Sequence, residues 1–131
     1  MDTSSWYRNL IKPSFAPPSW LFGPVWAVLY TIILVTYGYM IYLVTKGSLP
    51  KKILVPLFLN LVSNLLFSPI QFGLQNNALA AVDITVVLAT LVCLITLLIP
   101  HSKVLALAQI PYLLWVAFAT VLQYSITWLN R

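Results

Sequence analysis

The sequence predicts an all-α, polytopic membrane protein: a bundle of four transmembrane helices in a single domain that covers residues 1–131. Of its residues, 61% are hydrophobic and only 7% are charged. Four apolar stretches are each long enough to cross a hydrocarbon core, which takes about 20 helical residues. The connections between them are short and contain turn-forming residues, so consecutive helices must be antiparallel neighbours.

The four predicted helices follow one another along the chain. The first covers about residues 20–44, and a segment rich in proline and tryptophan, residues 6–19, precedes it. Prolines fix their own backbone and donate no hydrogen bond, so they predict a stiff, non-helical segment there. The other helices cover about 53–72, 78–99 and 104–129, and the connections are "TKGSLPKK", "GLQNN" and "PHSK".

The basic residues lie at the ends of the predicted helices rather than in a stripe interleaved with aromatic residues, so we expect no nucleic-acid binding. With four spans, both termini lie on one side of the membrane. That side carries Arg8, Lys12 and Arg131, whereas the other carries Lys46, Lys51, Lys52 and Lys103. Because Lys and Arg are enriched on the cytoplasmic side, this count favours termini on the non-cytoplasmic side.

Three of the predicted helices carry polar or aromatic residues at spacings of three and four, which place them on one face. These residues are Gly23, Trp26, Tyr30 and Tyr37; Asn60, Ser63, Asn64, Phe67 and Gln71; and Gln109, Tyr112, Trp115, Ala119 and Gln123. In lipid, such faces turn towards other helices or a cavity. We therefore expect the stripes to converge inside the bundle, where they either bond the helices together or line a pocket.

Three single residues, Asp83, His101 and Cys93, have side chains that can carry chemistry. Asp83 is the one acid inside a predicted helix, where an ionisable group is either functional or held by hydrogen bonds to its neighbours. His101, the sole histidine, has no partner at ligand spacing, and no acid–base pair or nucleophile–base set is visible. We therefore expect no metal site and no catalytic residues. Cys93 is interpreted as a small core residue.

The tryptophans fall into two groups by depth. Trp6, Trp20 and Trp128 lie near the membrane face that holds the termini, where an aromatic belt is the ordinary explanation. Trp115 lies near the middle of its predicted span, which indicates a cleft with aromatic walls, and Trp26 suits either role. A buried indole N–H needs a hydrogen-bond partner.

These residues resemble the signature of the translocator protein family, the tryptophan-rich sensory proteins, whose animal member is the peripheral benzodiazepine receptor. The similarity lies in three blocks, "WYRNLIKPSFAPPSWLFGPVWAVLY", "NLLFSPIQFGLQNNALAAVD" and "IPYLLWVAFATVLQYSITWLN". Together they cover most of residues 6–130, in the family's order.

The resemblance implies a ligand pocket inside the bundle, with Trp26 and Trp115 as two of its walls. It implies that residues 6–19 fold over the mouth of this pocket, and the expected loop residues are Trp6, Pro17, Pro18 and Trp20. The expected ligand-binding residues, from the stripes and the resemblance together, are Gly23, Trp26, Tyr30, Asn64, Phe67, Asp83, Tyr112, Trp115, Ala119 and Gln123.

The chain also departs from the family pattern. Family members have five spans, with a helix ahead of the Trp–Tyr loop, whereas this chain begins at that loop; we expect a short form without the first helix. A partner subunit then supplies the missing wall, the cleft opens to lipid, or the start of the chain is misassigned. Four positions differ from the family pattern in ways that make the pocket somewhat more polar: Asn60, Phe67, Gln71 and Gln123.

The leading expectation is an integral membrane protein that binds flat, mostly apolar ligands in a sensory, transport or regulatory role. Porphyrins or haem-type tetrapyrroles are the ligands that the resemblance implies, with no obligatory cofactor. Two alternatives stay open: light-dependent porphyrin degradation with Trp26 and Trp115 as redox-active rings, and a structural subunit of a membrane assembly. The expected partners are the bilayer, the ligand, and a second copy in a dimer or another subunit.

Overall fold

The computed structural model is all-helical over the residues that it describes, which are 10, 13, 14, 16, 19–70, 74 and 76–130. Its elements, in order, are η1 (Ser19–Leu21), α2 (Phe22–Thr45), η2 (Lys51–Ile53), α3 (Leu54–Ser68), α4 (Asn77–Leu98), α5 (Lys103–Ala108) and α6 (Ile110–Leu129). Most of the predicted 6–19 loop, including Trp6, Pro17 and Pro18, lies outside the described residues, as does Gln71.

Three helices are long and apolar enough to cross a membrane: Gly23–Thr45, Asn77–Leu98 and Ile110–Leu129. The helix predicted over 53–72 is represented by η2 and by α3, which has 15 residues. At about 1.5 Å per residue, α3 alone is shorter than a hydrocarbon core of about 30 Å. It ends before Pro69, which cannot donate the next helical hydrogen bond. Three spans are therefore found over the described residues, and the fourth stays a prediction.

The helix predicted over 104–129 is divided at Gln109 into α5 and α6. Pro111 lies in the first turn of α6. In one continuous helix its ring would clash with the carbonyl group of Leu107, and its nitrogen would donate no hydrogen bond. Gln109 is fully buried at the break, and its Nε2 donates to Thr36 Oγ1 on α2 at 3.0 Å. The break is thus anchored to the first span.

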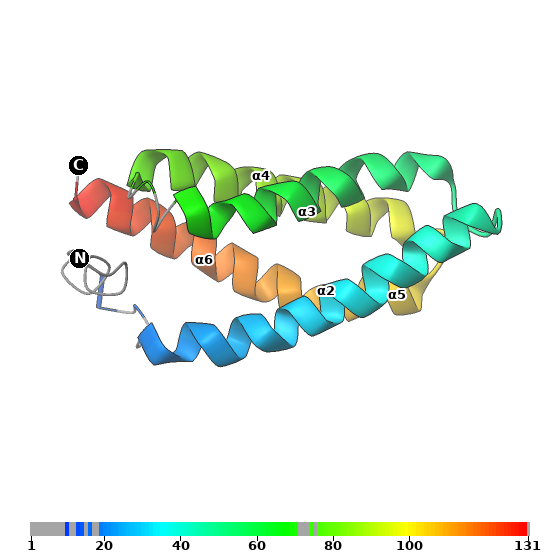
Figure 1. Ribbon diagram of the computed structural model, residues 1–131, viewed down its shortest axis with the longest axis horizontal. Coiled ribbons are helices and arrows are strands. Elements are labelled where there is room, and N and C mark those ends of the chain that lie inside the picture. Colours follow the sequence, from blue (N-terminus) through cyan, green and yellow to red (C-terminus); the bar gives the residue numbers. More distant parts are fainter. Residues whose placement is uncertain are drawn as a thin grey trace.

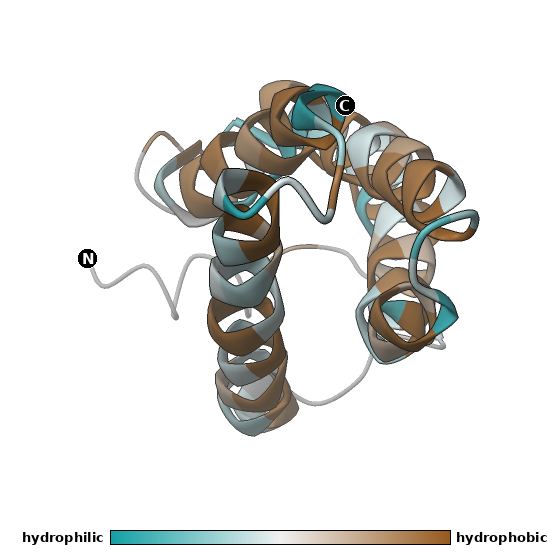
Figure 2. Cartoon of the chain, turned by 90° about the vertical axis from the view of Figure 1, so that its right-hand side faces the viewer, coloured by the Kyte–Doolittle hydropathy of each residue, from teal (hydrophilic) through white to brown (hydrophobic). Residues whose placement is uncertain are grey.

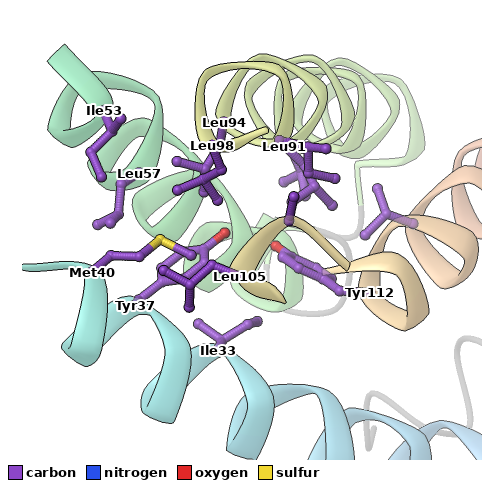
Figure 3. Close-up of a cluster of buried hydrophobic side chains, with 14 of the residues drawn as sticks. Ile33, Tyr37, Met40, Ile53, Leu57, Leu91, Leu94, Leu98, Leu105 and Tyr112 are labelled. Atoms are coloured by element: carbon purple, nitrogen blue, oxygen red, sulfur yellow. The ribbon is translucent and has the colours of Figure 1, made fainter. Parts of the chain in front are cut away.

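The central helix is α4, with α3 packed along it on one side and α6 on another. In Figure 1, α2 approaches the other helices near the 46–52 connection and diverges from α3 towards the end where α2 begins. Side chains from all five α-helices form one buried core. Figure 3 shows part of this core, where Met40, Leu57 and Leu94 come from α2, α3 and α4. The backbone of α2 diverges from α3, so α2 is held to the bundle mainly by its long side chains, which pack in the shared core.

The outer faces of the helices are apolar as well. Leu34 and Leu114 are among the exposed large hydrophobic residues, and Figure 2 shows hydrophobic residues on the outer sides of the helices. This is the pattern of helices surrounded by lipid. Cys93 is exposed on α4, so its interpretation as a core residue was wrong. The buried face of α4 runs through Leu91 and Leu94 and leaves Cys93 outside.

The connection between α2 and η2 turns at Gly47, whose φ is 79°. This left-handed conformation costs other residues about 1–2 kcal/mol, and a Cβ at Gly47 would meet no atom within 4 Å. We expect Gly47→Ala to lower the free energy of unfolding by about 1 kcal/mol, measured by thermal unfolding in detergent. Gly38→Ala is the matched control, because Gly38 is helical with equally open surroundings. Equal losses in both variants would contradict the backbone explanation.

Candidate functional site

A hydrogen-bond network centred on Asn60 joins four helices inside the bundle. Asn60 Oδ1 accepts from the hydroxyl groups of Tyr37 on α2 and Tyr112 on α6, at 2.7 and 2.9 Å. Its Nδ2 donates to the carbonyl oxygen of Val87 and to Thr90 Oγ1, both on α4, at 2.9 and 3.2 Å. Figure 3 shows Tyr37 and Tyr112 extending into the core from α2 and α6. Asn60 therefore uses both of its donors and both acceptor positions.

Asn64, one turn further along α3, extends this network. Its Nδ2 donates to the Tyr112 hydroxyl at 2.5 Å, and its Oδ1 accepts from the Tyr30 hydroxyl at 3.2 Å. Asn64 and Tyr112 are buried, whereas Tyr30 is partly exposed. The prediction that the polar stripes converge inside the bundle is confirmed at these residues. Their side chains bond the helices to one another, as the first of the two expected uses requires.

An apolar groove with a volume of about 420 Å³ lies between α2 and α6. It is lined by Val25, Val28 and Leu29 of α2 and by Pro111, Leu114 and Trp115 of α6. The Trp115 ring packs against Phe118, with ring centroids 5.7 Å apart. Ligand pockets in proteins typically measure about 300–1,000 Å³ and have mostly apolar walls. The groove therefore has the size and the lining of a site for a small apolar molecule.

Trp26 is not among the residues that line this groove. It follows Val25 on α2 and points about 100° further round the helix. Its ring lies 5.4 Å from that of Tyr30, whose hydroxyl bonds to Asn64. The structure therefore places Trp115 in the groove wall and Trp26 beside the polar network.

Trp20, Gly23, Phe67 and Ala119 lie outside both the groove lining and the network, as do Asp83 and Gln123. Trp20 is 71% exposed at the beginning of the first span, a position typical of an interfacial aromatic residue. Gly23 is also exposed, and a Cβ there would meet no atom within 4 Å. Phe67 and Ala119 are partly buried and pack against the core.

Asp83 and Gln123 lie closer to the end of the bundle where α4 begins and α6 ends. Asp83 is buried on α4, and its Oδ2 has no hydrogen-bond partner among the residues that the structure describes. Gln123 Nε2 donates to the carbonyl oxygen of Asn77 at 3.1 Å, and Thr127 Oγ1 donates to the same oxygen at 3.0 Å. Gln123 therefore ties the last part of α6 to the first residue of α4.

Two described residues of the predicted pocket loop contact α6. Leu10 and Ala16 are partly buried against a small apolar cluster on α6 that Phe118 also packs against, formed by Leu122 and Ile126. Phe118 is also the ring neighbour of Trp115. Leu122 and Ile126 lie about two and three turns beyond Trp115 along α6, so Leu10 and Ala16 pack on α6 away from the residues that line the groove.

Sequence reasoning did not find the aliphatic walls of the groove. Val25, Val28, Leu29 and Leu114 are ordinary residues of a lipid-spanning helix, and their apolar character does not distinguish a groove wall from a lipid-facing surface. The sequence does indicate the α6 wall, because Pro111 and Leu114 lie within about one turn of Trp115 on that helix. That signal identifies one wall only, because the facing residues of α2 depend on how the two helices pack.

In a comparison with known protein families, residues 1–129 match the model of the TspO/MBR family. The chain belongs to the TspO/MBR family. The resemblance drawn from the three sequence blocks is thus confirmed. Membership and the three span-length apolar helices make the chain an integral membrane protein.

Curated relatives are 31–40% identical to this chain over the aligned residues. The tryptophan-rich protein TspO of Bacillus cereus is 40% identical over 126 residues, which are 96% of this chain and 81% of the relative. That of Archaeoglobus fulgidus is 36% identical over 131 residues, 98% of this chain and 82% of the relative. The translocator protein of Homo sapiens is 38% identical over 126 residues, which cover 92% of this chain and 72% of the human protein.

Proposed function

We propose that this TspO/MBR family member binds a flat, mostly apolar ligand of the porphyrin class within the bilayer, in a sensory, transport or regulatory role. The observation that supports this is the groove of about 420 Å³ between α2 and α6, with the Trp115 ring in its wall. The proposed site is this groove.

The chemistry of the groove suits such a ligand. A tetrapyrrole has two broad apolar faces, and one of them can stack on the indole of Trp115. The other face then contacts aliphatic side chains such as Val28 and Leu29. Asn64 and Tyr112 use their polar groups in the network between the helices, so in this proposal they hold the walls in place.

The finer arrangement in the membrane is also part of the proposal. A fourth span runs through α3, and the termini lie on the non-cytoplasmic side, because the four lysines at the opposite end outnumber the basic residues near the termini. The protein works with a second copy or a partner subunit, and it needs no obligatory cofactor.

The function is tested by titrating protoporphyrin IX into the purified protein in detergent and following the quenching of tryptophan fluorescence. We expect saturable quenching, and about tenfold weaker binding for Val28→Phe because the added ring fills the groove. Val35→Phe is the matched control: it lies on the same helix with a similar exposed fraction, 64% against 61%, but does not line the groove.

Two results would count against the proposal. Equal affinities of the two phenylalanine variants would mean that the ligand does not occupy the groove. No saturable quenching, in a protein of unchanged helical content, would favour the role of a structural subunit.

A further inference from the structure

A second groove, with a volume of about 250 Å³, lies where α4, α5 and α6 meet. Its lining is aliphatic except for one lysine: Ile95, Ile99, Lys103, Ala106, Leu107 and Ile110. It is smaller than the pockets of about 300–1,000 Å³ that hold compact drug-sized ligands. Its size and lining favour a narrow hydrocarbon chain.

The depth of this groove follows from the length of α4. The helix runs from Asn77 to Leu98 over 22 residues, or about 33 Å, which matches a hydrocarbon core of about 30 Å. Leu98 therefore lies at one boundary of the core, and Lys103 lies beyond it at the level of the lipid headgroups. Ile95 lies about one turn deeper, so the groove leads from the headgroup region into the acyl-chain region.

The charge at this end of the bundle is positive. Lys46, Lys51, Lys52 and Lys103 are all exposed here. Within the described part of the chain the only acid is Asp83, about 22 Å from Leu98 along α4. At this distance the Asp83 carboxylate makes no contact with the Lys103 ammonium. The Lys103 ammonium therefore faces no described carboxylate that would compete with an anionic ligand.

We propose that this groove binds one anionic phospholipid, with the phosphate held by the Lys103 ammonium and an acyl chain lying along Ile95 and Leu107. Lysine is a common phosphate ligand, and basic pockets between membrane helices bind anionic headgroups. The surrounding lysines favour a lipid with net negative charge over a zwitterionic one. This site is separate from the groove between α2 and α6, and the proposal does not depend on the porphyrin ligand.

The test is native mass spectrometry of the full chain in mild detergent, with phosphatidylglycerol or phosphatidylcholine added at equal concentrations. We expect one retained phosphatidylglycerol, at least fivefold above phosphatidylcholine. Lys103→Gln should reduce its retention at least fivefold, whereas the matched control Lys51→Gln should change it less than twofold. Equal losses in both variants would mean diffuse attraction to the lysine-rich end and would overturn the site. Equal retention of the two lipids would overturn it as well.

A second variant tests the acyl-chain part of the groove. Leu107 is exposed, so Leu107→Trp adds a ring at the groove without removing a core side chain. It should lower phosphatidylglycerol retention at least threefold with Lys103 intact, whereas Leu34→Trp, exposed on α2 and outside this groove, should not. Unchanged retention in Leu107→Trp, or displacement of the lipid by millimolar inorganic phosphate, would contradict the proposed acyl-chain contact. Helical content and unfolding temperature of each variant show whether it is folded.

Discussion

Asn60→Leu is expected to lower the free energy of unfolding by about 3–5 kcal/mol. Asn60 makes four hydrogen bonds to three other helices. Leucine has the same number of side-chain heavy atoms and the same branching but makes none of these bonds. Hydrogen bonds between membrane helices average about 0.6 kcal/mol each. In addition, a buried polar group left without its partner costs about 1–3 kcal/mol, and Tyr37 loses its acceptor in this variant. Thermal unfolding in detergent, followed by circular dichroism, measures the loss.

A control and a double variant separate the network from a general effect on α3. Ser63→Ala changes a partly buried residue of the same helix and should cost less than about 0.5 kcal/mol. Adding Tyr37→Phe to Asn60→Leu removes the hydroxyl group that has lost its acceptor, so the double variant should be more stable than the sum of the two single losses predicts. Strictly additive losses would mean that Tyr37 and Asn60 are not coupled.

The network was predictable from the sequence for a physical reason. Asn60 and Asn64 lie one turn apart, so the spacing alone places both amides on one face of α3. An amide that faces lipid finds no hydrogen-bond partner there, so amides in a membrane span face the interior of the bundle. The same reasoning located Tyr37 and Tyr112. The specific pairing of these groups required the structure, since spacing gives the face of a helix but not the residue opposite it.

The groove between α2 and α6 was less predictable. Val28 lines it and Leu34 does not, yet both are exposed aliphatic residues of the same helix. The break between α5 and α6 had a visible cause in Pro111, but its position also depends on Gln109 reaching Thr36 on a distant helix. Local spacing does not reveal such long-range contacts.

The second large effect that we expect concerns the two tryptophans that the resemblance pairs in one pocket. Trp115→Ala should weaken protoporphyrin IX binding about 5- to 140-fold, because stacking on an aromatic side chain contributes about 1–3 kcal/mol and each 1.4 kcal/mol is a factor of ten. Trp26→Ala should weaken it less than about threefold, because Trp26 packs beside Tyr30 and does not line the groove. Trp115→Phe keeps a ring in the wall and should retain most of the affinity.

Porphyrin absorbance is the suitable readout for these variants, because each alanine substitution removes a fluorophore. Trp128→Ala controls for the loss of an exposed indole and should bind as the unmodified chain does. If Trp26→Ala lost as much affinity as Trp115→Ala, the ligand would have to contact both rings. That result would place it deeper than the groove, near Tyr30 and Asn64, and the amides would then orient the ligand as well as join the helices. A large loss for Trp115→Ala alone would instead assign binding to the α2–α6 groove and leave the Asn60 network a structural role.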